Sequence, residues 1–180
     1  QFDMRSGEDD GVSDPEFLKK VDQFTDWARD HQVVTNVQSI TDIFKRLNRD
    51  LNGGDTSFYK LPEDRELAAQ YLLLYELSLP FGLDLKNQID INKASTQVVV
   101  TIDDLTTNEI RGWIREAERF LNDEVGISSV AAGPTVMFSY IAERNIQGML
   151  WGTFYAVIII SVLILVALKD FKLGLISLIP

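Results

Sequence analysis

The chain has 180 residues, which is enough for one domain of ordinary size and a little more. It contains no cysteine, which excludes a disulfide framework, a thiolate metal site and a cysteine nucleophile. The formal net charge is −10, and since the residues from Met149 onward contribute +1, those before it carry −11. Phosphate binding needs clustered lysine and arginine, so this acidic portion argues against nucleic acid and against docking on anionic lipid.

The first forty residues predict a strand, a helix and a second strand. Gln1–Arg5 alternates apolar and polar residues, which is typical of a half-buried strand. Ser13 can cap a helix with Pro15 in its first turn, and Glu16 can reach back to complete the start signal. Val33–Val37 is rich in β-branched residues and predicts the second strand. The apolar face of the helix consists of Phe17, Val21, Phe24 and Ala28.

Residues 40–92 predict a helical insert that contains two helices. Ser39 is placed to cap the first helix, and Pro62 opens the second one after a glycine-containing loop. Pro80 and Gly82 are expected to stop the second helix, because proline cannot continue it.

A third strand, another helix and a last strand follow the insert. Alternation over Thr96–Ile102 predicts the strand. Thr106 and Glu109 have the spacing of a capping box and predict a helix, which Gly126 closes. Ile127–Ala132 is expected to form the last strand before the chain turns into a further helix.

These elements define an α+β fold. Without the insert their order is strand-helix-strand twice over, which is the order of a ferredoxin-like split βαβ unit. Both ends of the sequence are expected to be cuts in a longer polypeptide. The expected parts are an α+β domain at 1–133 with its helical insert at 40–92, a connecting helix at 134–148, a transmembrane helix at 149–168, a turn at 169–172 and the start of a further transmembrane helix at 173–180.

The stretch from Met149 to Leu168 is nearly all apolar and contains no charged residue. About 20 such residues cover a hydrocarbon core of about 30 Å, so the stretch predicts a transmembrane helix. The alternative is a buried core helix, which is usually shorter and keeps a polar face. Lys169 and Lys172 follow the stretch and indicate a cytoplasmic turn, so residues 1–148 are expected to face the periplasm or the exterior.

The sequence contains few patterns that are typical of catalytic or binding sites. It contains no H-E-x-x-H, G-x-S-x-G or P-loop pattern. The one histidine, His31, fits a solvated or capping position better than a catalytic one. The acidic clusters Glu8–Asp10 and Asp103–Asp104 lack EF-hand spacing, and Tyr71 and Tyr75 fit core packing better than an apolar groove. We therefore predict no catalytic, cofactor-binding or metal-binding residue, and no enzyme.

Three stretches of the chain resemble segments of exporters in the resistance-nodulation-division superfamily. The likeness is to its lipid and hydrophobe exporter branch, which is related to the mycobacterial large membrane proteins. Glu66–Glu76 is similar to a helix of the second extracytoplasmic domain in that family. Gln88–Thr101 is similar to the segment that enters its third strand. Phe171–Pro180 resembles the turn that opens the next span, and with the layout of parts the likeness covers nearly the whole chain.

The resemblance implies a fragment of a proton-driven exporter of hydrophobic or lipid-like substrates, located in the inner (cytoplasmic) membrane as part of a multi-pass protein. Residues 1–148 would contribute a porter-type domain, with alternating access supplied by the two halves of the exporter. The implied partners are the remainder of the same polypeptide, the lipid bilayer and a hydrophobic or amphiphilic substrate. The proton-carrying carboxylates of the family lie on a span outside this sequence.

Two other classes remain open from the sequence. One is the extracytoplasmic domain of a different membrane machine, such as an ABC-type permease or a protein-export subunit. The short turn from Lys169 to Lys172 into another apolar segment disfavours it. The other is a membrane-anchored sensor or binding module without a transport role, which would hold a defined ligand by itself.

Overall fold

The computed structural model describes residues 1–80, 85 and 88–168 of the chain. It divides into two compact units, of which the first is Gln1–Val136 and the second begins at Met137. The predicted turn at 169–172, the predicted start of a further span at 173–180, and Gly82 as a helix stop lie outside the described residues.

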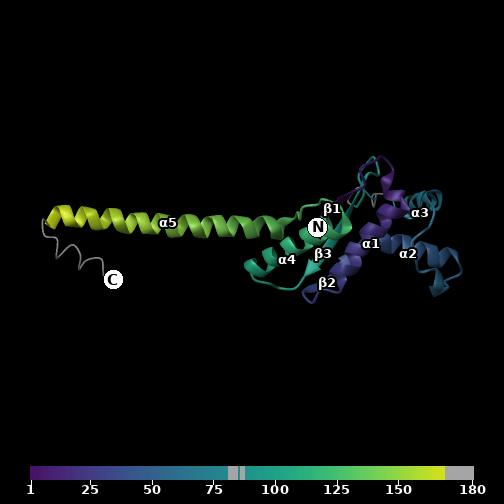
Figure 1. The fold of residues 1–180 in the computed structure, drawn as a ribbon, viewed down its shortest axis with the longest axis horizontal. Helices are drawn as coiled ribbons and strands as arrows, with labels where there is room; N and C mark the ends of the chain where they lie inside the picture. The colour runs from purple at the N-terminus through teal and green to yellow at the C-terminus, as the bar shows by residue number, and fades with distance from the viewer. Residues whose placement is uncertain (81–84, 86–87, 169–180) are drawn as a thin grey trace. The chain divides into compact units, whose positions relative to one another are not determined.

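The described residues of the first unit form three strands and four α-helices (Figure 1). They also include short 3-10 turns at Gly11–Ser13 and Thr56–Phe58 and a π-helical turn at Leu121–Val125. In chain order the main elements are β1 (Phe2–Arg5), α1 (Pro15–Arg29), β2 (Val34–Gln38), α2 (Ile40–Leu51), α3 (Arg65–Ser78), β3 (Ser95–Ile102) and α4 (Thr107–Phe120).

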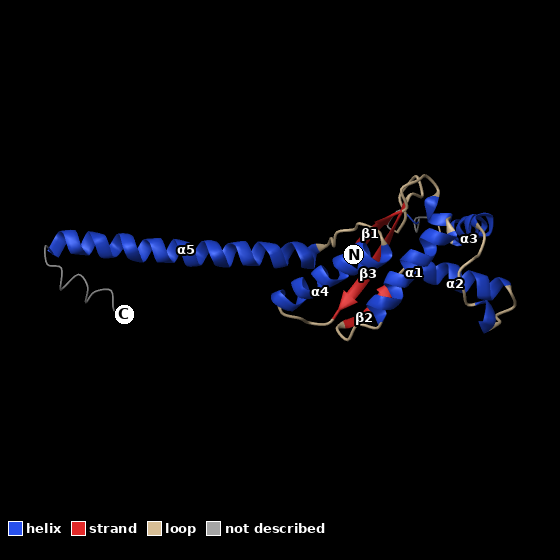
Figure 2. Ribbon diagram, viewed as in Figure 1, coloured by secondary structure: helices blue, strands red, loops and turns tan. Residues whose placement is uncertain are grey.

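The strands form one antiparallel sheet in the order β1-β3-β2 (Figure 2). Phe2 of β1 lies opposite Val98, and Val37 of β2 lies opposite Val100. Because side chains alternate between the faces of a sheet, these four apolar residues share one face. The α+β class predicted from the sequence is confirmed by this small sheet and its helices.

Ile127–Ala132 does not form the regular fourth strand that the sequence predicts. The segment makes one isolated bridge, between Phe2 and Ala131, and exchanges two hydrogen bonds between Gln1 and Ala132. Beyond this pair the Asp3 carbonyl accepts from the Ser129 hydroxyl at 2.8 Å, where an antiparallel ladder would place the Val130 amide. The four-residue β1 also leaves few positions for pairing, so the segment stays irregular.

Helices α1 and α4 cover the apolar face of the sheet. Phe2 is buried between them, with ring centroids 5.1 Å from Phe24 of α1 and 5.9 Å from Trp113 of α4. Trp27 stacks on Phe120 at 4.6 Å, which joins the two helices directly. Edge-to-face and stacked rings are favourable geometries, so this aromatic cluster holds the sheet and both helices as one core.

Two of the three predicted helix caps are confirmed, and one is wrong. Ser39 caps α2, and Thr106 forms the complete capping box of α4 with Glu109. Helix α1 is capped by Asp14, whose carboxylate accepts from the amide of Glu16 at 3.2 Å. Ser13 is buried in the preceding 3-10 turn and cannot serve as the cap.

Replacing Glu109 by glutamine is expected to lower the thermal midpoint of unfolding near neutral pH. Hydrogen bonds from the Thr106 hydroxyl and amide hold the pKa of the Glu109 carboxyl below its ordinary value of 4.5. Since the charged form is favoured by folding, its contribution is present above pH 4.5 and is lost as pH falls through the lowered pKa. Thermal melts of both proteins should therefore converge once the pH has fallen below the lowered pKa of Glu109.

The matched control for this measurement is Glu124→Gln, at an exposed glutamate after α4. Its melting profile should follow that of the wild type at every pH. A difference between Glu109→Gln and wild type that persists undiminished in acid would contradict the assignment of the effect to the charged capping box.

Helices α2 and α3 lie between β2 and β3 in the chain and are joined by a buried polar contact. The Tyr71 hydroxyl donates to Asn48 Oδ1 at 2.9 Å, and Asn48 Nδ2 donates to the carbonyl of Lys60 at 2.9 Å. Tyr71 is therefore a core residue, as expected, whereas Tyr75 is only partly buried. The outward face of α3 exposes the apolar side chains of Leu73, Leu74 and Leu77.

Helix α5 runs from Pro134 to Leu168 without interruption, so the predicted connecting helix and predicted span are one helix of 35 residues. Its segment Pro134–Ile164 is, among the described residues, the one helix long and apolar enough to cross a membrane. Only 6% of its most apolar window is buried. Since a core helix would be mostly buried, the exposure favours the transmembrane interpretation over that alternative.

Candidate functional site

The face of the sheet away from α1 and α4 carries a different set of side chains. In the sheet register Asp3 lies opposite Gln97, Asn36 opposite Thr101, and Gln38 opposite Val99. All of these residues except Val99 are polar. An antiparallel sheet commonly packs one face on a core and leaves the other accessible, and this alternation matches that arrangement.

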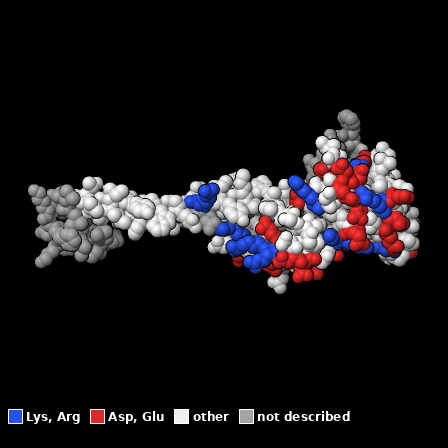
Figure 3. Space-filling view, turned by 45° about the horizontal axis from the view of Figure 1, so that its top comes forward, with Lys and Arg blue, Asp and Glu red and all other residues white. Residues whose placement is uncertain are grey.

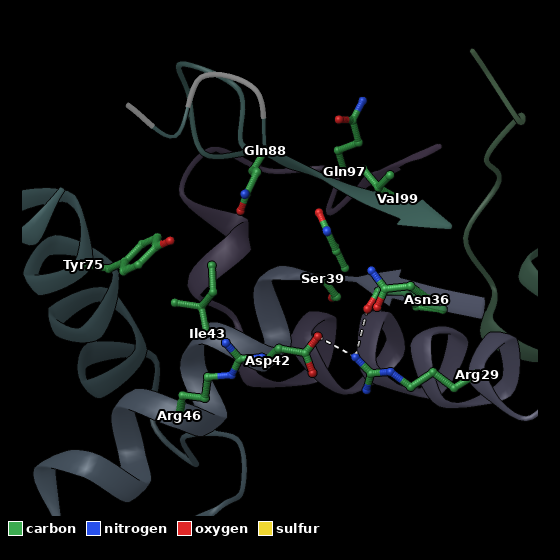
Figure 4. A pocket seen from close by; sticks show the side chains of 12 residues that line it. Arg29, Asn36, Ser39, Asp42, Ile43, Arg46, Tyr75, Gln88, Gln97 and Val99 are labelled. Atoms are coloured by element: carbon green, nitrogen blue, oxygen red, sulfur yellow. Dashed lines mark hydrogen bonds and ion pairs between the residues drawn. The ribbon is translucent and has the colours of Figure 1, made fainter. Parts of the chain in front are cut away.

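A cavity of about 460 Å³ lies where this polar face meets α2 and α3. A volume of this size is typical of pockets for small molecules. Figure 4 shows the Tyr75 hydroxyl, the Gln88 amide and the Asp42 carboxylate bordering the same space. The lining residues are Arg29 from α1, Asn36, Val37 and Gln38 from β2, Ser39 before α2, Asp42, Ile43 and Arg46 from α2, Tyr75 from α3, Gln88 from the loop before β3, and Gln97 and Val99 from β3.

One wall of the cavity is formed by the ion pair between Arg29 and Asp42. Arg29 Nη2 donates to Asp42 Oδ2 at 2.5 Å and to the carbonyl of Val37 at 3.2 Å, and Arg29 Nη1 lies 3.5 Å from Asp26. The Asp42 side chain is 12% exposed, so the charge-assisted bond is shielded from water. Arg29 thereby neutralises Asp42 and ties α1, β2 and the start of α2 together.

A second arginine of the cavity has no such partner. Arg46 lies one helical turn after Asp42 and is exposed. The ion pairs of α2 that join described residues use Asp42, Lys45 and Arg49, and none of them uses Arg46. The guanidinium of Arg46 therefore lies at the cavity without an ion pair to a described carboxylate.

The Ser39 hydroxyl at the cavity is held by the start of α2. Ser39 Oγ lies 3.0 Å from Thr41 Oγ1 and accepts from the Thr41 amide at 3.3 Å, which is a helix-capping arrangement. A serine nucleophile needs an adjacent general base, and no such base is bonded to it among the described residues. The cavity is suited to binding through charge and hydrogen bonds.

His31 lies just after the end of α1, and its Nδ1 accepts from the amide of Val33 at 3.5 Å. Its Nε2 lies 3.6 Å from the Glu116 carboxylate, and its ring lies near Trp27 and Trp113. The side chain is 27% exposed and is therefore half-buried. It connects the end of α1 with α4 and lies outside the cavity.

The acidic clusters are loop residues. Glu8 forms an ion pair with Arg65 at 2.9 Å, and Asp103 and Asp104 are exposed. Within residues 1–80, 85 and 88–168, no group of three or more histidine and carboxylate side chains is placed to hold a metal ion. The described structure therefore supplies no candidate metal site at these loops.

The second unit offers an apolar surface. Figure 3 shows acidic and basic side chains spread over the α+β unit, whereas the long helix is almost free of charge. Large apolar side chains of α5 are exposed on all sides between Met149 and Leu163. Near the beginning of this apolar stretch, Trp151 contacts Phe154 and Tyr155. Amphipathic rings at one end of an apolar helix are typical of the membrane interface.

The fold and these surfaces define a class of protein, an acidic α+β domain followed by a candidate membrane-spanning helix. Comparisons with protein-family models, curated proteins and solved structures found no match to this chain. Sequence reasoning did not anticipate the cavity, because its residues come from five elements and a loop and share no spacing along the chain. The unpaired arginine among amide side chains becomes recognisable only once the elements are packed.

Proposed function

We propose that this chain is part of a proton-driven exporter of hydrophobic or lipid-like substrates, in the exporter branch of the resistance-nodulation-division superfamily. The observation that carries the proposal is the direct continuation of the acidic α+β unit into a 35-residue apolar helix with exposed sides. The sequence resemblance of Glu66–Glu76 and Gln88–Thr101 adds to it.

In this proposal the first unit is a ferredoxin-like porter-type domain. The antiparallel order β1-β3-β2, with α1 and α4 on one face, supports that topology. The irregular segment that touches the free edge of β1 through Ala131 occupies the place where such a fold has its fourth strand. The helical segment at 40–92 is an insert in this domain.

The proposed location is the inner membrane, in a multi-pass arrangement with residues 1–148 outside and 169–172 in the cytoplasm. The chain lacks cysteine, so each introduced cysteine is a single site for labelling. We expect Ser57→Cys, at an exposed site, to react with a membrane-impermeant maleimide in intact cells. We expect Lys172→Cys to react only after the membrane is opened. The reverse pattern would overturn the proposed orientation.

Transport itself is testable with the complete polypeptide that contains this chain. Reconstituted into vesicles, it should move a fluorescent phospholipid analogue when a proton gradient is imposed. Dissipation of the gradient by an ionophore should stop the movement. Movement that requires ATP and ignores the gradient would instead indicate a permease with a nucleotide-binding partner. A chain that moves no lipid but holds a defined ligand would indicate a binding module.

A further inference from the structure

We propose that the cavity between the open sheet face and helices α2 and α3 is a binding site for a small hydroxylated group that carries one phosphate or carboxylate. Such a group occurs both as a free solute and as the head of an amphiphilic lipid. The inference is drawn from the charge and polarity of the cavity, and it does not depend on the proposed export function.

The anion is assigned to Arg46. Arg29 is already held by Asp42 and by the Val37 carbonyl, so its charge is balanced inside the structure. Arg46 has no ion pair with a described carboxylate and lines the same cavity. A guanidinium offers a planar set of donors that matches phosphate and carboxylate oxygens. Because Arg46 is the arginine of the lining without such a pair, the site is suited to a ligand with a single anionic group.

The hydroxylated part is assigned to the amide side chains. Amides of asparagine and glutamine both donate and accept hydrogen bonds, as hydroxyl groups do. Gln38 and Gln88 line the cavity from β2 and from the loop before β3. Figure 4 shows the Gln88 amide and the Tyr75 hydroxyl directed toward the same space. The surrounding polar groups therefore match several hydroxyls better than a bare acyl chain.

The cavity also has the size and support that a binding site needs. Its volume of about 460 Å³ accommodates a phosphorylated sugar or polyol. Its floor is the hydrogen-bonded strand pair β2–β3, and its α2 wall is fixed by the ion pairs Arg29–Asp42 and Lys45–Asp22. Donors held by rigid elements lose little conformational freedom when a ligand binds.

The test uses the full chain in detergent micelles, titrated with inositol 1-phosphate by calorimetry. We expect saturable binding that Arg46→Gln weakens by about 10–100-fold, because a hydrogen bond to a charged group is lost. Arg49→Gln is the matched control, since Arg49 lies on the same helix outside the cavity and pairs with Asp50. It should bind as the wild type does.

Two further probes separate the parts of the ligand. Inorganic phosphate and uncharged inositol should each bind more weakly than inositol 1-phosphate. Gln88→Leu should reduce the preference for inositol 1-phosphate over inorganic phosphate. If Gln88 had a purely structural role, this preference would stay unchanged. All variants are checked by thermal melting, and Arg46 is exposed, so Arg46→Gln should melt as the wild type does.

A titration with a lipid shows whether the bound group is a free solute or the head group of a lipid. One outcome is that short-chain phosphatidylinositol binds and Arg46→Gln weakens its binding, while free inositol 1-phosphate does not bind. This outcome would support the site and assign it to the head group of a lipid. Binding of both would support a site for the head group itself. No binding of either probe, or equal binding by wild type and Arg46→Gln, would overturn the proposal whatever the outcome of the transport assay.

Discussion

Replacing Phe24 by alanine is expected to lower the free energy of unfolding of the α+β unit by about 3–5 kcal/mol. The Phe24 side chain is fully buried, and its ring contacts Phe2 at 5.1 Å and Trp27 at 5.9 Å. Alanine removes the buried ring and leaves a cavity that strand β1 and helix α1 cannot both move to fill. A urea titration followed by circular dichroism measures the change.

The control for this substitution is Phe58→Ala. Phe58 is 37% exposed, lies in the turn at Thr56–Phe58 and belongs to no aromatic pair of the core. Its replacement should change the free energy of unfolding by less than about 0.5–1 kcal/mol. Equal effects at both positions would show that the cluster around Phe24 is not the centre of the core.

Replacing Ile158 by arginine is expected to prevent stable insertion of α5 into the membrane in a large fraction of molecules. Ile158 lies near the middle of the apolar stretch, and its side chain is exposed. An arginine at the centre of a membrane helix costs about 2.5–3.5 kcal/mol relative to water on insertion scales, whereas isoleucine is favourable there. The share of protein that resists alkaline extraction from membranes measures the change.

Two controls accompany Ile158→Arg. Ile158→Leu keeps the apolar character and should insert as the wild type does. Leu77→Arg introduces the same charge at an exposed apolar residue of α3, outside the candidate span, and should leave insertion unchanged. Unimpaired membrane retention of Ile158→Arg would argue that α5 does not cross the bilayer.

Local chemistry explains the elements that were predicted correctly. Ser39 and the pair Thr106 and Glu109 satisfy backbone amides within a few residues of themselves, so their effect can be read from spacing alone. The same holds for the apolar run after Met149, since its length and lack of charge do not depend on the rest of the fold.

The wrong predictions arose where distant residues compete for the same groups. Ile127–Ala132 has the composition of a strand, but the Ser129 hydroxyl donates to the Asp3 carbonyl, which a ladder would pair with the amide of Val130. Ser13 has the right type for a cap, yet it is buried in a turn and Asp14 caps the helix. Neither outcome follows from the sequence around these residues.

Propensity, charge and hydropathy are local properties, so the class of the elements, the acidic character of the first unit and the apolar helix at its end follow from the amino-acid sequence alone. The cavity, in contrast, depends on how the elements pack. The balance of Arg29 by Asp42 and the unpaired state of Arg46 depend on contacts across elements that are far apart in the chain. Such contacts exist only after packing, so the candidate binding site could not be recognised before it.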